Sequence, residues 1–489
     1  MKNTLILLST LLLATLHAAG ATEPAPKPNI VFILADDLGY TDLGCYGSKY
    51  YETPNIDRLA AGGIRFTSGQ TCGPNCQPTR AALMSGQYGP RTGVYTVGSI
   101  DRFNWQSRPL RPADNVTQLP LDKTTIAEAL RRAGYATAMF GKWHLGNNGD
   151  YHPAKRGFDE AIESSGVHFN FSTTPNVSYP PGTYLADFLT DKALDFIRRH
   201  KERPFFLYLP HFAVHSPHQA KTNLIARFQP KAPAGGHRDP NYAAMIASVD
   251  ESVGRIAAAL EEFKLTENTL VIFSSDNGGV GGYVREGIKT AGDITDNAPL
   301  RGGKGMLYEG GVRVPFIFRW LGQIPAAATC DTPISSVDLF PTLLEVAAAK
   351  PPPGQPLDGV SCLGLLTSGG KAALKRDAIF WNFPGYLGAG QDSWRTTPVG
   401  VIRASDWKLL EFFEDGRLEL YNLREDLGEK TNLAAKLPDK TRELHARLRA
   451  WRAEIKAPMP RPKTDADTAA GKQQATGKKN KKRAAVNEK

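Results

Sequence analysis

A cysteine lies where a loop leads into a predicted helix. The run from Cys72 to Gly86 reads CGPNCQPTRAALMSG. Pro78 suits the first helical position, and the small apolar residues after it favour a helix that ends at Gly86. Unpaired amides at a helix N-terminus favour negative charge, so we expect a thiolate at Cys76 or an anion bound beside it. Arg80, one turn further on, adds donors suited to a tetrahedral oxyanion.

Pairs of oxygen ligands follow two predicted buried strands. The strands and their pairs are residues 29–35 with Asp36 and Asp37, and residues 269–275 with Asp276 and Asn277. Unbroken apolar runs are typical of parallel strands covered on both faces, whose carboxyl ends form the ligand-binding edge of α/β sheets. An Asx turn could explain either pair alone, but two pairs on matching strand ends favour a metal. Their oxygens suit Ca²⁺, or less well Mg²⁺, rather than zinc.

Basic residues follow two more predicted strands and occupy one glycine-rich loop. These are Lys142 and His144 after residues 135–140, His211, His215 and His218 after residues 204–209, and Lys304 within residues 300–311. A lone histidine is more often structural than catalytic, but repeated placement after strand ends favours function. The loop around Lys304 lacks the spacing of a nucleotide-binding P-loop.

This ordered set resembles the type I sulfatases, whose signature matches Cys76-x-Pro78-x-Arg80 and the small-residue helix up to Gly86. A phosphatase loop is excluded, because the required arginine position is occupied by Ala82. In the sulfatases a maturation enzyme oxidises the cysteine to formylglycine. The hydrated aldehyde attacks sulfur, and its second hydroxyl then allows sulfate to leave as the aldehyde re-forms.

The resemblance also implies residue roles. Calcium would be bound by Asp36, Asp37, Cys76 in its modified form, Asp276 and Asn277, and the sulfate would be surrounded by Arg80, Lys142, His144, His215 and Lys304. His215 or Lys304 would protonate the leaving alcohol, and His144 is a candidate base. Asn382 and Gly385 stand where many relatives carry histidines. We expect this loop to border the substrate, so the resemblance says least about the preference for the leaving group.

The order of predicted elements indicates an α/β fold with a large doubly wound, mostly parallel sheet flanked by helices. A further strand is expected over residues 312–320. Short alternating runs after residue 376 predict a smaller antiparallel sheet closed by an amphipathic helix. The expected divisions are a signal peptide over 1–21, a catalytic domain over 27–365, a C-terminal subdomain over 376–456 and a basic disordered tail over 457–489.

The N-terminus has the basic, apolar and small-residue regions of a signal peptide, which predicts export to the periplasm or outside the cell. Its apolar run is shorter than the roughly 18 residues of a membrane-spanning helix, so we expect no membrane anchor. Five cysteines are an odd number for an exported chain, which indicates that one is modified or free. Cys76 is the candidate; Cys330 could pair with Cys362, or the remaining cysteines could be buried unpaired.

The net charge of +10 owes much to the lysine-rich segment 472–489, which lacks aromatic residues and carries no nucleic-acid motif. Attraction to an acidic polysaccharide remains an alternative to a merely solvated tail. The first hypothesis is therefore a sulfatase acting on a sulfated carbohydrate. The alternatives are a phosphate or phosphonate monoester hydrolase and a non-catalytic sulfoglycan-binding protein.

Overall fold

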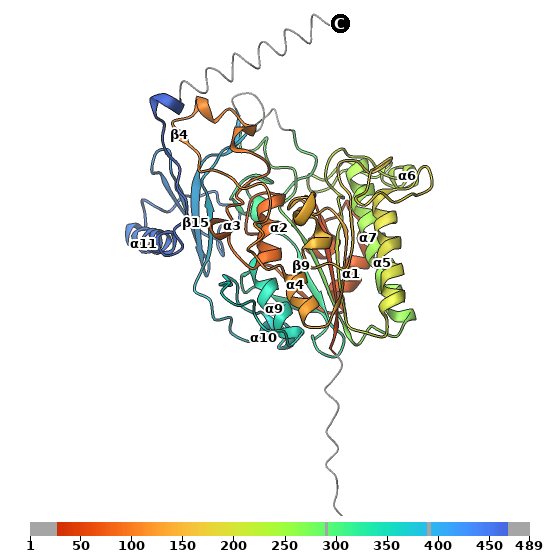
Figure 1. Ribbon diagram of the computed structural model, residues 1–489. Helices are drawn as coiled ribbons and strands as arrows, with labels where there is room; N and C mark the ends of the chain where they lie inside the picture. The colour runs from red at the N-terminus through yellow and green to blue at the C-terminus, as the bar shows by residue number, and fades with distance from the viewer. Residues whose placement is uncertain (1–26, 289–291, 389–392, 468–489) are drawn as a thin grey trace, which may run out of the picture.

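An eight-stranded mixed sheet forms the centre of the computed structural model (Figure 1). The structure describes residues 27–288, 292–388 and 393–467, so the predicted signal peptide lies outside the described residues. In spatial order the strands are β10 (Ala328–Cys330), β2 (Ile64–Phe66), β9 (Phe316–Arg319), β8 (Thr269–Ser275), β1 (Asn29–Ala35), β7 (Phe205–Pro210), β5 (Ala136–Gly141) and β6 (Glu160–Glu163). Only the pairings of β9 with β2 and β8 are antiparallel within this sheet, which confirms the predicted, mostly parallel α/β fold.

Helices cover both faces of this sheet, as Figure 1 shows. One face is covered by α1 (Pro54–Ala61), α5 (Leu185–His200), α6 (Thr222–Phe228) and α7 (Pro240–Glu262). The other face is covered by α2 (Cys76–Ser85), α4 (Ile126–Arg132), α9 (Leu339–Val346) and α10 (Leu363–Thr367). The sheet is therefore the middle of three layers.

Strand β1 shows how burial places the polar residues. Val31 and Ile33 pack toward α5 and α7, whereas Ile30 and Phe32 pack toward α2 and α4. All four side chains are at most 2% exposed. Fully burying such a side chain stabilises the fold by roughly 1.5–3 kcal/mol. Because neither face of the strand tolerates a charge, the carboxylates of this segment follow its last residue, at the edge of the sheet.

A second, four-stranded antiparallel sheet lies near the C-terminus, as predicted. Its strands are β12 (Ile379–Phe383), β15 (Val399–Ala404), β16 (Trp407–Phe412) and β17 (Leu418–Asn422), followed by α11 (Pro438–Glu454). Figure 1 shows β15 beyond α2 and α9, with α11 outermost. Trp451 of α11 stacks on Phe380 of β12, with ring centroids 4.6 Å apart. The helix thus closes the outer face of the small sheet.

The strand predicted over residues 312–320 is shorter in the structure. A helical turn, α8 (Glu309–Val312), precedes β9, which begins only at Phe316. Arg313 Nε donates a 2.6 Å hydrogen bond to Glu309 Oε2, and this spacing of four residues fits a helical turn rather than a strand. Val312, the first residue of the predicted strand, therefore belongs to this turn.

The prediction of disorder from residue 457 onward is wrong for residues 457–467. Strand β18 (Arg461–Pro462) pairs antiparallel with β4 (Leu110–Arg111), and Lys463 Nζ donates to the Gln106 carbonyl at 2.7 Å. Main-chain pairing of this kind leaves no trace in side-chain composition. Residues 468–489 lie outside the described part of the chain.

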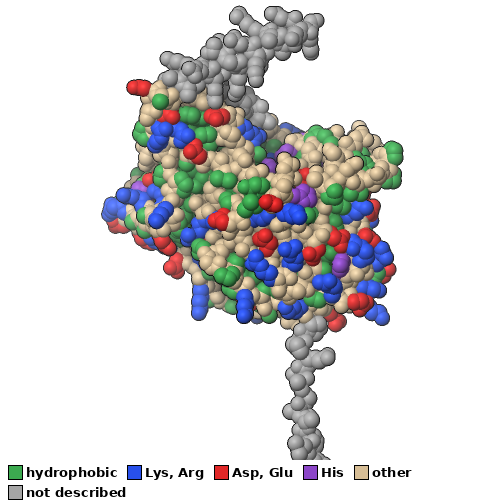
Figure 2. Space-filling view, viewed as in Figure 1, with side chains coloured by type: hydrophobic (Ala, Val, Ile, Leu, Met, Phe, Trp, Pro, Cys, Tyr) green, Lys and Arg blue, Asp and Glu red, His purple; other side chains and the backbone are tan. Residues whose placement is uncertain are grey.

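All five cysteines are unpaired, so the suggested bond between Cys330 and Cys362 does not form. Cys362 Sγ lies 3.2 Å from Thr342 Oγ1, and Cys330 Sγ lies 3.9 Å from the Gly370 carbonyl. Within the described residues, no helix combines the length and the apolarity needed to span a bilayer. Figure 2 shows basic and acidic side chains interspersed on the visible face, so the charge there forms no single basic patch.

Candidate active site

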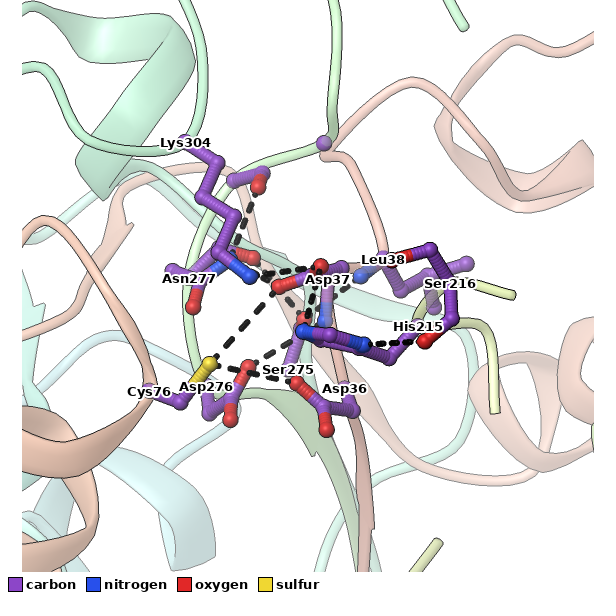
Figure 3. Close-up of polar contacts among 12 residues, drawn as sticks. Asp36, Asp37, Leu38, Cys76, His215, Ser216, Ser275, Asp276, Asn277 and Lys304 are labelled. Carbon is purple, nitrogen blue, oxygen red and sulfur yellow. Dashed lines mark hydrogen bonds and ion pairs between the residues drawn. The ribbon is translucent and has the colours of Figure 1, made fainter. Parts of the chain in front are cut away.

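The polar residues predicted at strand ends meet at one edge of the large sheet. Strands β8, β1, β7 and β5 are parallel neighbours, and Figure 3 shows that residues following β8, β1 and β7 converge. The loop after β5 reaches the same place, because Lys142 Nζ contacts Asp36. The loops after these four strands carry Asp276 and Asn277, Asp36 and Asp37, His215, and Lys142 and His144, respectively. The N-terminus of α2 and the glycine-rich loop add Cys76 and Lys304. The predicted site residues are therefore brought together. They form two layers, one buried in the interior and one that lines a cavity.

Cys76 is the first residue of α2, with Asn75 as N-cap, so Pro78 is the third helical residue rather than the first. The helix ends at Gly86, whose φ of 67° is the left-handed conformation that glycine favours. Cys76 Sγ lies 3.4 Å from Asp36 Oδ1 and 3.9 Å from Asp37 Oδ1. Burial and the negative charge of Asp36 raise the pKa of the Cys76 thiol. Burial and Asp36 therefore oppose the expected thiolate at the unmodified residue.

The deeper layer of the site is a set of buried ion pairs. Arg80 donates to Asp276 Oδ2 from Nε at 2.9 Å and from Nη1 to the Lys142 carbonyl at 2.6 Å. Lys142 Nζ donates to Asp36 Oδ2 at 2.6 Å. All four side chains are at most 6% exposed. Arg80 and Lys142 thus hold carboxylates, whereas the sequence had suggested direct contact with an oxyanion.

The protonation of these carboxylates follows from their partners. Burial opposes ionisation of Asp36, but Lys142 and other nearby cations hold its pKa well below the usual range. The pKa of Asp37 is also lowered, because Lys304 and His215 outweigh the effect of burial. Burial and the charge of Asp36 raise the pKa of Asp276 to about 6. The site thus keeps two anionic carboxylates beside Cys76.

The shallower layer lines a cavity of about 360 Å³. From the predicted set, this cavity is lined by Asp37, Cys76, His144, His215 and Lys304. Lys304 Nζ donates to Asp37 Oδ2 at 2.7 Å, and His215 Nε2 lies 3.7 Å from the same oxygen. In Figure 3 the Asp37 carboxylate lies between these two side chains. Asp37 therefore lies at the boundary between the cavity wall and the buried carboxylates below it.

The pKa values of His144 and His215 are both lowered. Burial lowers the pKa of His144 well below its ordinary value, and Lys142 and Arg80 lower it further. Burial also lowers the pKa of His215, although Asp37 and Asp36 oppose this effect. His144 Nδ1 is buried without a hydrogen-bond partner among the described residues, so it is available to a ligand.

A cation would fit between the acids and Cys76. Ligand atoms of Asp36, Asp37, Cys76 and His215 lie within 4.8 Å of one another. Asn277 Oδ1 is buried with no partner in the described residues, while its Nδ2 donates to Asp37 Oδ1 at 2.8 Å. Asp276 is not in the 4.8 Å group; its Oδ2 accepts from Arg80 and its Oδ1 from the Asp37 amide. Oxygen atoms predominate in the set, which suits a hard cation such as Ca²⁺.

Sequence reasoning missed three residues of the cavity wall. Arg102, Phe103 and Arg395 line the cavity but belong to no motif and follow no strand of the large sheet. The segment around Asn382 was expected to border the substrate. Instead Asn382 Nδ2 donates to the Pro458 carbonyl at 3.0 Å, and the adjoining Leu387 contributes to the cavity.

Comparison with known proteins agrees with this geometry. Residues 28–349 match the family model described as Sulfatase, and residues 303–454 match that described as N-sulphoglucosamine sulphohydrolase, C-terminal. A sulfatase of Formosa agariphila is 36% identical over 95% of this chain and 98% of its own length. The N-acetylgalactosamine-6-sulfatase of Canis lupus familiaris is 34% identical over 84% of this chain and 77% of its own.

Solved structures are similar over most of the chain. Ps i-CgsB in complex with k-i-k-neocarrahexaose has a TM-score of 0.73 and 31% identity, covering 87% of this chain and 92% of that one. The PsFucS1 sulfatase from Pseudoalteromonas sp. has a TM-score of 0.71 and 26% identity, covering 90% and 92%. The protein therefore belongs to the sulfatase family of sulfuric ester hydrolases.

Proposed function

We propose that this sulfatase removes sulfate from a sulfated carbohydrate, using a formylglycine formed at Cys76 and a Ca²⁺ ion held beside it. The observation that carries the proposal is the position of Cys76 in the cavity wall, with Sγ 3.4 Å from Asp36 and 3.9 Å from Asp37. A nucleophile there and a cation held by the same carboxylates would reach one entering ester. The carbohydrate substrate is supported by a relative named N-acetylgalactosamine-6-sulfatase and by a structural neighbour bound to neocarrahexaose.

The residues that would hold calcium are Asp36, Asp37, Asp276, Asn277 and the modified residue 76. When bound there, the ion would supply positive charge to the sulfate oxygens. Arg80 and Lys142 would act indirectly, because their hydrogen bonds position the carboxylates of Asp276 and Asp36. The measured calcium content of the purified protein should fall in Asp37→Ala and stay unchanged in Glu443→Gln, a variant of an exposed acid on α11. Equal contents in both variants would contradict the ligand assignment.

Side chains in the cavity can carry the proton transfers. Lys304 and His215, both beside Asp37, would face the ester and either could protonate the leaving alcohol. His144 is neutral with a free Nδ1, so it can accept a proton from a hydroxyl at residue 76. Preorganised positive charge around the sulfate would supply the main stabilisation of the transition state.

Peptide mass spectrometry across Cys76 tests the nucleophile. The chain should be produced together with a formylglycine-generating enzyme, which is the partner that the proposal requires. We expect the aldehyde in place of the thiol. An intact thiol in material where that enzyme has converted a control sulfatase would overturn the proposed chemistry.

Turnover of p-nitrophenyl sulfate and p-nitrophenyl phosphate tests the reaction class. We expect the sulfate to be hydrolysed with the higher kcat/KM. A wide preference for phosphate would indicate a phosphate or phosphonate monoester hydrolase instead. Binding of a sulfated glycan with no turnover and an unmodified Cys76 would indicate a binding protein.

We also propose export, which is supported by the signal-like residues 1–21. Cleavage near Ala21 should leave a mature N-terminus close to residue 22. N-terminal sequencing of protein from the periplasm or medium measures this. Retention of the complete leader in the cytoplasmic fraction would contradict it.

A further inference from the structure

Two arginines line the active-site cavity without a carboxylate partner among the described residues. Arg102 is exposed and Arg395 of β14 (Trp394–Thr396) is half-buried, whereas Cys76 is only 1% exposed. The two guanidinium groups therefore lie nearer to solvent than the proposed nucleophile. The only acid among the described residues that line this cavity is Asp37, which is already bonded to Lys304.

Arg395 is held against the loop that carries Lys304. Its guanidinium carbon lies 4.7 Å from the centroid of the Tyr283 ring, and the Tyr283 hydroxyl donates to the Lys304 carbonyl at 2.8 Å. Gly305 provides the room, since a Cβ there would lie 2.9 Å from Arg395 Cδ. Gly305 has a φ of 92°, where a side chain would also be strained. The arginine is therefore positioned in advance by packing.

The charge of Arg395 is unmatched within the described residues. It forms no hydrogen bond or ion pair with any of them, and its Nε is shielded from solvent without a partner. Other arginines nearby are paired: Arg301 with Glu286, and Arg417 with Glu419. A shielded N–H group without an acceptor is costly unless a ligand supplies one. A guanidinium in a cavity suits a carboxylate or sulfate, which can accept two parallel hydrogen bonds.

We propose that Arg395, assisted by Arg102, binds a second anionic group of the substrate, next to the sulfate that is removed. The inference rests on the proposed function and narrows it to glycans that carry a further sulfate or carboxylate. Lys304 already supplies positive charge beside Cys76, and His144 and His215 add polar ring nitrogens there, so the two arginines are available to another anion. Phe103 and Leu387 line the same cavity and offer an apolar surface to a sugar ring.

The test compares two sugars that differ by one anion: a monosulfated disaccharide and the same disaccharide with a second sulfate. Wild type should prefer the disulfated sugar in kcat/KM. In Arg395→Gln that preference should fall by roughly 10- to 100-fold, the range for losing a hydrogen bond to a charged group. Arg395→Lys should restore part of it, and Arg102→Gln should reduce it less. Arg424→Gln is the matched control, because Arg424 is an exposed arginine that does not line the cavity.

Binding separates this inference from the proposed reaction. Calorimetric affinities for both sugars should be measured in the Cys76→Ala background, with and without Arg395→Gln. Loss of the affinity difference in the arginine variant supports the subsite even if no sulfate ester is hydrolysed. An equal loss of affinity for both sugars, or an unchanged preference in Arg395→Gln, would overturn the proposal. The same preference should also weaken as salt is raised, because ions screen the attraction.

Discussion

Two clusters of buried charged groups differ in how far solvent and ligands can reach them. The first is the active-site cluster of Asp36, Asp37, Arg80, Lys142, Asp276 and Lys304. The second, here called the interface cluster, joins α8 to the small C-terminal sheet and comprises Glu309, Arg313, Arg403, Lys408 and Glu429. Both combine carboxylates with lysine and arginine in the interior.

The interface cluster is closed to solvent. Lys408 Nζ lies 2.9 Å from both Glu309 Oε1 and Glu429 Oε1, and all three side chains are 0% exposed. Glu429 Oε2 also accepts the Glu309 amide at 2.7 Å. At the active site, by contrast, Lys304 of the cluster and the neighbouring His215 have side chains that are 14% and 26% exposed, and both line a cavity.

The same kinds of charged group therefore serve two purposes, fixing elements together and binding a ligand. Ions that are paired and closed to water fix one element against another, and removal of one partner leaves a buried charge. Ions that line a cavity can exchange a protein contact for a ligand contact. We therefore expect substitutions in the active-site cluster to act on turnover and those in the interface cluster to act on stability.

The largest effect is expected for Cys76→Ala. Removing the residue that becomes the nucleophile should lower kcat/KM for p-nitrophenyl sulfate by about 10⁴-fold or more. The melting temperature should change little, since the thiol makes only weak contacts with Asp36 and Asp37. Turnover and thermal unfolding of one preparation measure both quantities. Substantial activity in this variant would contradict the assigned nucleophile.

Asp276→Ala should affect both turnover and stability. It removes the carboxylate that pairs with Arg80 at 2.7 Å, so a buried guanidinium loses its partner. We expect no detectable hydrolysis and a loss of about 3–5 kcal/mol in the free energy of unfolding. Denaturant unfolding supplies the second value. A variant that is fully active would show that this residue has no part in the site.

Lys408→Met should destabilise the protein by about 3–5 kcal/mol, because it leaves the two glutamates without their shared cation. The folded fraction should keep its kcat within roughly 3-fold. Adding Glu309→Gln should recover part of the lost stability, which a double-mutant cycle would measure. If Lys408→Met instead abolished turnover at unchanged stability, the distinction between the two clusters would fail.

The smallest effect concerns the pH dependence of stability. Burial and the charge of Glu309 raise the pKa of Glu429 to about 7, although Lys408 opposes this. A carboxyl whose folded pKa is raised stabilises the fold fully below its unfolded pKa of about 4.5 and loses that contribution as pH rises toward 7. As pH rises from about 4.5 to 7, the free energy of unfolding should fall less in Glu429→Gln than in wild type, by roughly 1–3 kcal/mol. Denaturant unfolding at several pH values measures this. The same change of unfolding free energy with pH in both proteins would contradict the raised pKa.

Some of the site could be predicted because strand burial constrains it. A strand covered on both faces can carry Asp36 or Asp276 only beyond its last residue, so the edge of the sheet follows from the pattern. Arg102 and Arg395 could not be predicted in this way. They belong to short segments outside the large sheet, and their meeting in one cavity depends on how the C-terminal part packs beside that sheet.

The chemical groups that this sulfatase brings to one sheet edge follow from residue type and apolar periodicity, because both are local properties of the sequence. The packing of distant segments sets three further features: Arg80 and Lys142 lie beneath the cavity, burial raises the pKa of the unmodified Cys76 thiol, and Arg395 has no acidic partner in the described chain. These outcomes depend on distances of a few ångströms between segments far apart in sequence. Electrostatic energies in a buried environment change steeply over such distances.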